Sequence, residues 1–161
     1  MIDNPRSPRV RAVAKLAKRA AREETGLFLV EGPQALREAL SFHPELLVEV
    51  FAVRGVFDRH PELGRGLSAA GIEPEQVSDA VLEAMADTVT PQGVVAVAKQ
   101  FPVTIKDLLA RGSKLVAILE EVRDPGNAGT IIRAADAAGA DGVILTGKSV
   151  DAYNPKVVRS T

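Results

Sequence analysis

Asn127 and Arg133 are the two side chains whose types and spacing suggest chemistry in this sequence. They follow Asp124-Pro125-Gly126, a turn in which proline fixes φ and glycine permits a positive φ. We expect Asn127 to open a helix, so that Arg133 lies roughly 9 Å further along it at 1.5 Å per residue. A guanidinium in that position can face a ligand and grip a phosphate. The spacing leaves open a plainer interpretation, in which Asn127 caps the helix and Arg133 is a solvated arginine.

Two strand-like runs flank this stretch and predict a βαβ unit. Residues 115–119 and 142–145 are short apolar runs, and Gly139 is a typical helix end between them. The helix should bury apolar residues at i, i+3, i+4 and i+7, namely Ile131, Ala134, Ala135 and Ala138. In a parallel sheet, ligands bind beyond the carboxyl ends of the strands, which is where the turn before Asn127 lies.

A basic cluster at the N-terminus predicts contact with a polyanion. Residues 1–22 hold seven basic residues and one acidic residue. The whole chain has 20 basic and 21 acidic residues, so residues 23–161 hold 13 basic and 20 acidic residues. Pro8 should begin one helix that Thr25-Gly26 ends. At 100° per residue, four basic side chains on it fall within about 60° of each other, opposite the apolar stripe: Arg11, Lys15, Lys18 and Arg22.

Such a basic ridge can follow RNA phosphates, with an affinity that falls steeply as salt rises. The alternative is a solvated charged face with no partner. The residues expected to contact RNA are Arg9, Arg11, Lys15, Lys18, Arg19 and Arg22. Aromatic residues make up only 4% of the chain, so we expect no base-stacking platform.

Composition narrows the functional classes. The 161 residues are 46% apolar, which suits a globular protein, and none is cysteine, so disulfides and thiolate metal sites are excluded. His43 and His60 are the only histidines, and neither has a ligand-like neighbour three or four residues away, so we predict no metal site. No apolar run approaches the roughly 18 residues of a membrane span, and no signal peptide is visible. We therefore expect a cytoplasmic location.

Alternating strand and helix patterns predict an α/β fold in two parts. Residues 1–99 should form one α/β domain, residues 100–114 a linker, and residues 115–161 a second α/β unit. Two strands and one helix cannot enclose a core of their own, so we expect the second unit to be incomplete. The strands expected in the first part are 27–30, 46–53 and 94–98, with an edge strand at 72–77, and the helices are 34–40, 62–70 and 79–86.

Residues 142–149 match the Walker A pattern letter for letter, but we expect no nucleotide site there. A P-loop has its strand before the first glycine, whereas here the strand lies between Gly142 and Gly147. An extended strand cannot form the ring of backbone N–H groups that surrounds a phosphate.

Three stretches resemble the SpoU/TrmH family of RNA 2′-O-ribose methyltransferases in the SPOUT superfamily. Residues 124–144 closely resemble the family's first signature motif, whose Asn and Arg fall on Asn127 and Arg133. Residues 153–159 resemble the segment after the second strand, and residues 28–32 resemble a segment near the N-terminus. The resemblance covers nearly the whole chain.

This resemblance implies an L30e-like RNA-binding α/β domain, followed by the first βαβ unit of a SPOUT (trefoil-knot) methyltransferase domain. The family's second and third motifs, which bind S-adenosylmethionine, are absent from these 161 residues, so most of the cofactor site should be missing. Members of the family are homodimers that associate through the knot.

The implied activity is S-adenosylmethionine-dependent 2′-O-ribose methylation of structured RNA, with 23S ribosomal RNA as the first candidate. Arg133 would act near the 2′-hydroxyl, and Asn127 would orient the substrate or hold the motif turn. A guanidinium stays protonated in proteins, so we expect Arg133 to grip the adjacent phosphate and help the proton leave.

Two other interpretations are open. The chain is a non-catalytic RNA-binding module, which is the activity expected of these residues alone, or an acidic α/β domain with no role on RNA.

Overall fold

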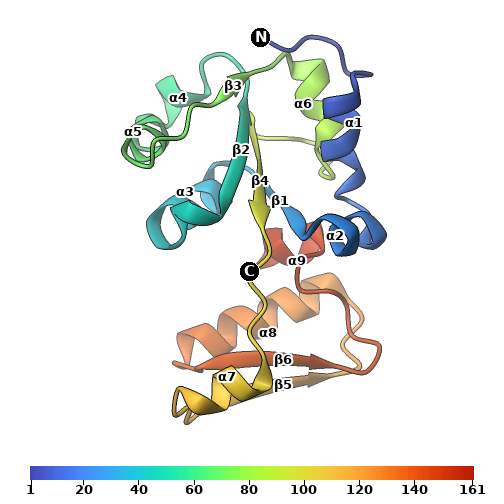
Figure 1. Ribbon diagram of the computed structural model, residues 1–161, viewed down its shortest axis with the longest axis vertical. Coiled ribbons are helices and arrows are strands. Elements are labelled where there is room, and N and C mark those ends of the chain that lie inside the picture. The colour runs from blue at the N-terminus through green and yellow to red at the C-terminus, as the bar shows by residue number, and fades with distance from the viewer. The chain divides into compact units, whose positions relative to one another are not determined.

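Strand β4, Val94–Lys99, is the central strand of the first part of the chain (Figure 1). Its apolar run is buried from Val94 to Ala98, as expected for a strand covered on both faces. It pairs antiparallel with β1, Leu27–Glu31, and with β2, Leu47–Ala52. The short strand β3, Glu75–Gln76, extends the sheet in parallel with β2, so the order is β1-β4-β2-β3.

Helices cover both faces of this sheet (Figure 1). On one side lie α3, Pro33–Phe42, α4, Val56–Arg59, and α5, Pro61–Ala69, with a 3-10 turn at Pro44–Leu46 after α3. On the other side α1, Pro8–Lys15, packs on α6, Asp79–Met85. The core on that side is one cluster of buried apolar side chains: Val10, Val13, Leu16, Leu29, Phe51, Val77, Val81, Leu82, Met85, Val95 and Val97.

The N-terminal basic segment forms two helices, so the prediction of one continuous helix is wrong. Helix α1 ends at Lys15 and α2 spans Arg19–Thr25, with Lys18 in an extended conformation between them. The cause is Arg22, whose side chain is only 1% exposed. Its Nη1 donates to the carbonyls of Leu16 and Ala17, each at 2.9 Å, and so pairs main-chain groups that the end of α1 leaves free.

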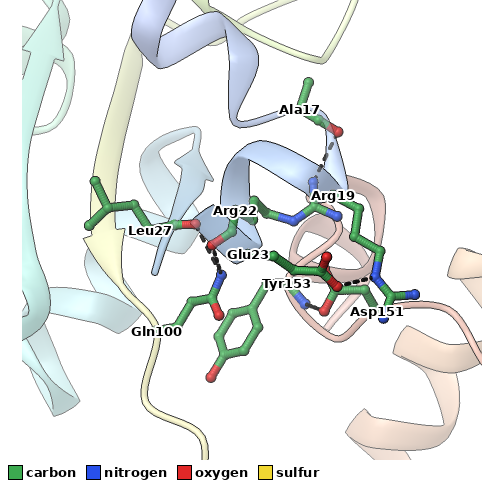
Figure 2. A network of polar contacts seen from close by, with 8 residues as sticks. All are labelled: Ala17, Arg19, Arg22, Glu23, Leu27, Gln100, Asp151 and Tyr153. Carbon is green, nitrogen blue, oxygen red and sulfur yellow. Dashed lines mark hydrogen bonds and ion pairs between the residues drawn. The ribbon is translucent and has the colours of Figure 1, made fainter. Parts of the chain in front are cut away.

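Figure 2 shows that this break belongs to a larger polar network in the first unit. Gln100 Nε2 donates to the carbonyls of Arg22 and Leu27, each at 3.1 Å, which fixes α2 and β1 to the end of β4. Because the Arg22 side chain is buried and bonded to the carbonyls of Leu16 and Ala17, its predicted place on an exposed basic ridge is wrong.

The second unit, Phe101–Thr161, is a small βαβ arrangement. The structure is a computed structural model that describes all residues, 1–161. Strand β5, Val116–Glu120, pairs in parallel and in register with β6, Gly142–Thr146. Helix α8, Pro125–Ala137, connects them, and α9, Pro155–Ser160, follows. The stretch expected to be a linker contains α7, Ile105–Ala110, which belongs to this unit.

Helix α8 buries Ala135 as predicted, whereas the other three residues of the predicted stripe, Ile131, Ala134 and Ala138, are exposed. Its buried residues are Ala128, Gly129 and Ala135, whereas Ile131 is 38% exposed. The stripe is rotated because α9 packs on α8 beside Gly129, and the core joins Ala128 to Leu119 and Val157. Even α8, the longest helix at 13 residues, lacks the combination of length and apolar character that a bilayer span requires.

We predict that Arg22→Met lowers the free energy of unfolding of the first unit by about 2–4 kcal/mol. The methionine keeps the buried volume but leaves two carbonyls without a donor, at roughly 1–3 kcal/mol each. Urea unfolding followed by circular dichroism measures the change. The matched control is Arg11→Met, an exposed arginine on α1 that should change stability by no more than about 0.5 kcal/mol. Equal losses in the two variants would contradict the structural role of Arg22.

Candidate functional site

Asp124, not Asn127, caps helix α8. Asp124 has extended dihedrals of φ −76° and ψ 123°, and its Oδ1 accepts from the N–H of Asn127 at 2.7 Å. Pro125 then occupies the first helical position, where its missing N–H costs nothing. The prediction that Asn127 opens the helix is therefore wrong by three residues. Its carboxamide is exposed and makes no hydrogen bond, which leaves it available for a ligand.

Arg133 is also exposed, and its guanidinium has no hydrogen-bond or ion-pair partner. Six residues separate it from Asn127, which places the two side chains about 120° apart around α8 at 100° per residue. The structure puts both on one helix but does not bring them onto one face. A ligand that touches both must therefore reach around the helix.

Two loops meet at the carboxyl edge of the β5–β6 sheet and are tied together by side chains. Glu121 Oε1 accepts from the N–H of Lys148 at 2.9 Å. The Ser149 hydroxyl accepts from the N–H of Val122 at 3.1 Å, and its oxygen lies 2.6 Å from the carbonyl of Thr146, to which it can donate. These bonds set the course of the chain into Asp124 and hence the start of α8.

Glu121 is the one non-glycine residue with a positive φ, 55°. This conformation turns its carboxylate toward the loop after β6, where a Cβ on Gly147 would overlap Glu121 Oε1. The Arg123 guanidinium, whose Nη2 lies 2.8 Å from Glu121 Oε2, and the Lys148 N–H lower the pKa of this carboxyl. Backbone strain of this kind is held at sites where the surrounding structure needs it. Nothing in the residue pattern signals this position.

Gly129 lets α9 approach α8 closely. A Cβ there would lie 2.9 Å from the carbonyl carbon of Ser160 and would overlap its side chain. The Ser160 hydroxyl also lies 3.2 Å from the carbonyl of Pro125, at the first turn of α8. A glycine inside an otherwise helical pattern is the signal that could have revealed this contact.

Residues 153–159 contain the start of α9. Asn154 caps it by accepting from the N–H of Lys156 at 2.9 Å, and Pro155 is the first helical residue. Proline fits this position because the first turn of a helix leaves its N–H groups without an intrahelical partner. The Tyr153 hydroxyl accepts from the N–H of Phe101 at 3.0 Å, and burial is the main cause of the raised pKa of Tyr153.

The six basic residues predicted to contact RNA do not form one surface. Arg9 pairs with Glu49 at 3.1 Å and Glu75 at 3.5 Å, and its guanidinium lies 5.2 Å from the centre of the Phe51 ring. Arg19 pairs with Glu23 at 2.7 Å, and Arg22 is buried. The remaining three are exposed and have no partner: Arg11, Lys15 and Lys18.

A groove of about 360 Å³ lies between α1 and α2. Arg11 and Lys15 line it together with the small apolar side chains of Ala12 and Ala21. The break in the basic segment therefore replaces the expected ridge by a shallow groove with two free cations.

Two known protein families match the chain. Residues 7–96 match the MRM3-like substrate binding domain, and residues 114–161 match the SpoU rRNA Methylase family. The first match alone covers more than half of the chain.

Individual proteins match across almost the whole chain. The 23S rRNA (guanosine(2553)-2′-O)-methyltransferase RlmP of Bacillus subtilis is 34% identical over 159 residues, which are 99% of this chain and 59% of that protein. An rRNA methyltransferase from Sinorhizobium meliloti shares the fold with a TM-score of 0.80 and 28% identity, over 99% of this chain and 59% of that one. AviRb from Streptomyces viridochromogenes, a SpoU methyltransferase solved with AdoMet, shares the fold with a TM-score of 0.74 and 30% identity. The match covers 96% of this chain and 58% of that one.

These structures confirm the predicted fold class, an α/β fold of the SPOUT methyltransferase type. The chain spans about three-fifths of the length of these relatives.

We predict that Gly129→Ala displaces α9 from α8 and destabilises the second unit by about 2–4 kcal/mol, because the new methyl would overlap the Ser160 side chain and would also lie 2.9 Å from the Ser160 carbonyl carbon, which cannot move without the helix. Hydrogen exchange of the α8 and α9 amides measures the loss of protection. Gly126→Ala is the control, since a Cβ there would lie 3.2 Å from one side-chain oxygen, Asp124 Oδ1, and would meet no atom of α9. Equal protection in the two variants would show that the close packing at Gly129 is not needed.

Proposed function

The chain belongs to the SpoU rRNA methylase family and carries an MRM3-like substrate-binding domain, and from this premise we propose that it serves S-adenosylmethionine-dependent 2′-O-ribose methylation of structured RNA. The predicted family is thereby confirmed. The observation that carries the proposal is the state of Asn127 and Arg133. Both motif side chains are exposed and without a partner on the helix that begins at the carboxyl edge of the sheet. RlmP, named as a methyltransferase of the 2′-oxygen of a guanosine in 23S rRNA, supports 23S ribosomal RNA as the substrate.

We propose Arg133 as the residue that holds the RNA at the reacting ribose. Its guanidinium is free and fully charged, so it can bind the phosphate next to the 2′-hydroxyl through two hydrogen bonds. Attack of that hydroxyl on a methyl group needs an in-line geometry, so holding the phosphate contributes to the rate by positioning. Asn127, three residues after the Asp124 cap, offers a donor and an acceptor to the same nucleotide.

S-adenosylmethionine supplies the methyl group when it is bound. The residues of the second unit do not enclose such a molecule, because Glu120, Glu121, Asn127 and Lys148 are all exposed at the edge of the sheet. We therefore assign no residue of this chain to the cofactor.

For RNA binding we propose the exposed cations of the first unit, namely Arg11, Lys15 and Lys18. They have no internal partner, and so their charge is available to phosphates. Arg9 and Arg19 are each paired with glutamate, so we propose that they contribute less to RNA binding. Arg22 is buried and is not among the proposed RNA-binding residues.

We also propose a homodimer working in the cytoplasm. The apolar side chains of Ile118 and Ile131, 66% and 38% exposed, support a further partner for the second unit. A ribosomal RNA substrate supports the location.

A second function, RNA binding without catalysis, is proposed for these 161 residues on their own. It is favoured because the first unit has its own core and free cations, whereas the second unit does not enclose a cofactor.

We predict that Arg133→Ala lowers methyl transfer to ribosomal RNA at least about a hundredfold in the protein expressed at the length its gene encodes, while RNA affinity changes little. Transfer of a labelled methyl group from S-adenosylmethionine and a filter-binding assay measure the two quantities. Arg111→Ala, which removes another exposed and unpaired arginine of the same unit, is the control and should keep full activity. An active Arg133→Ala variant would remove Arg133 from the mechanism.

We predict that the double change Arg11→Glu and Lys15→Glu lowers the RNA affinity of the 161-residue chain about tenfold or more at low salt and flattens its salt dependence. Fluorescence anisotropy over a salt series measures both effects. Arg54→Glu with Arg65→Glu carries the same charge change on exposed residues away from α1 and serves as the control. Unchanged affinity in the first variant would favour an α/β domain without a role on RNA.

A further inference from the structure

Glu121 uses both oxygens of its carboxylate at the edge of the β5–β6 sheet where α8 begins. Its Oε1 accepts from the N–H of Lys148 at 2.9 Å, and its Oε2 accepts from Arg123 Nη2 at 2.8 Å. The first bond reaches the loop after β6, and the second stays within the loop after β5. We call these two bonds the Glu121 clasp, because through them one side chain holds both loops.

The main chain at Glu121 is in a conformation that glycine adopts more easily. Its φ of 55° lies in the left-handed region, where a residue with a Cβ carries a steric cost. Every other residue with a positive φ in the chain is glycine, which adopts this conformation without that cost. The bonds of the Glu121 clasp offset the cost and hold a glutamate at a position that suits glycine.

Gly147 allows the two loops to lie close together. A Cβ on Gly147 would overlap Glu121 Oε1 and would lie 3.0 Å from Glu121 Cδ. The absence of a side chain at residue 147 therefore lets the carboxylate approach the N–H of Lys148. The Glu121 clasp thus depends on the residue types on both loops.

The main chain between Glu121 and Asp124 is fixed by further bonds to the loop after β6. The N–H of Glu121 donates to the carbonyl of Thr146 at 3.3 Å. Val122 is paired on both sides, since its N–H donates to the Ser149 hydroxyl at 3.1 Å and its carbonyl accepts from the N–H of Val150 at 2.8 Å. Together with the Glu121 clasp, these bonds set where Asp124 lies.

Asp124 passes this position on to the first turn of α8. Its Oδ1 accepts from the N–H of Asn127 at 2.7 Å, and its carbonyl accepts from the N–H of Ala128 at 3.0 Å. A shift of the loop before Asp124 would therefore move the turn that carries the Asn127 carboxamide. Methyl transfer needs an in-line geometry, and a misplacement of about 1 Å can lower a rate roughly a hundredfold.

We infer that Glu121 is a positioning residue for methyl transfer, which acts through Lys148 and Arg123 to hold the turn that places Asn127 against the nucleotide. The inference rests on the proposed function, in which Asn127 bonds the reacting nucleotide. In this role Glu121 touches neither the RNA nor the methyl group. Its effect falls on the rate of transfer rather than on the affinity for RNA.

Glu121→Gly removes the Glu121 clasp and also relieves the main chain at residue 121. In the protein expressed at the length its gene encodes, kcat for transfer of a labelled methyl group to ribosomal RNA should fall at least about tenfold. The KM for RNA should change less than about twofold, because no RNA contact is lost.

The matched control is Asp141→Ala, which removes another carboxylate that holds two main-chain groups. Asp141 accepts from the N–H of Lys114 at 2.7 Å and of Leu115 at 3.0 Å, at the amino edge of the same sheet. This variant gains no relief of a left-handed conformation, so its urea midpoint should fall more than that of Glu121→Gly. Its kcat should nevertheless stay parental, which reverses the order expected if activity only followed stability.

Two further measurements test the route from Glu121 to α8. In the 161-residue chain, the amides of Asn127 and Ala128 should exchange with solvent about tenfold faster in Glu121→Gly than in the parent chain. Glu121→Gln keeps an oxygen that can accept from the N–H of Lys148 but loses the charge that pairs with Arg123. It should therefore retain kcat to within about threefold.

Parental kcat in Glu121→Gly would overturn the inference, and the proposed function would survive if Arg133→Ala still lost methyl transfer. Equal losses of kcat in Glu121→Gly and Asp141→Ala would also overturn it, since both would then reflect general stability. Unchanged amide exchange at Asn127 would reject the route through Asp124. Absence of methyl transfer by the parent protein would reject the proposed function and the role of Glu121 together.

Discussion

Main-chain polar groups that no helix or strand satisfies are the constraint on which both units depend. Short helices and a two-stranded sheet leave many such groups at their ends, and several of them are paired here by side chains. Arg22 serves the end of α1, Glu31 the loop before β4, and Asp124 the start of α8. At the other end of the β5–β6 sheet, Asp141 accepts from the N–H groups of Lys114 and Leu115, bonds that lower the pKa of its carboxyl. Charged residues that would be taken for solvated surface residues in the sequence therefore stabilise the main chain of the fold.

This constraint explains which features the sequence could predict. Strands such as β4 and β6 follow from uninterrupted apolar runs, and Ser78 before α6 is a recognisable helix cap, so the order of the strands and of the helices α3, α5, α6 and α8 was predictable. The break between α1 and α2 was not, because the helical pattern continues through the segment and does not reveal that the Arg22 side chain is buried against the carbonyls of Leu16 and Ala17. The stripe on α8 was misplaced for a similar reason, since α9 packs against it from 30 residues away along the chain, as Gly129 beside Ser160 shows.

The sequence suggests the residues of the candidate site, but it does not predict their geometry. Family resemblance selects Asn127 and Arg133, and the structure adds that Asp124 does the capping, which frees the Asn127 carboxamide. The cations that we propose to contact RNA could be chosen only in part from the sequence, because charge counts do not distinguish Arg9, which is paired and lies over Phe51, from Arg11, which is free. A cleft of about 830 Å³ beside Arg59 in the first unit was not predictable from the sequence, since its lining comes from α3, α4, α6 and the loop before β4.

The contact between Glu121 and Gly147 has a consequence for how this edge of the sheet can evolve. A left-handed backbone at residue 121 suits glycine or asparagine better than glutamate, so drift at that position is inexpensive for the main chain. Replacing Glu121 instead removes the acceptor of the Lys148 N–H. A side chain at residue 147 would overlap the carboxylate at residue 121 for as long as that carboxylate is present, and the φ of +62° at residue 147 adds backbone strain for any residue other than glycine. The two positions are thus expected to covary, with loss of the carboxylate preceding any replacement of the glycine.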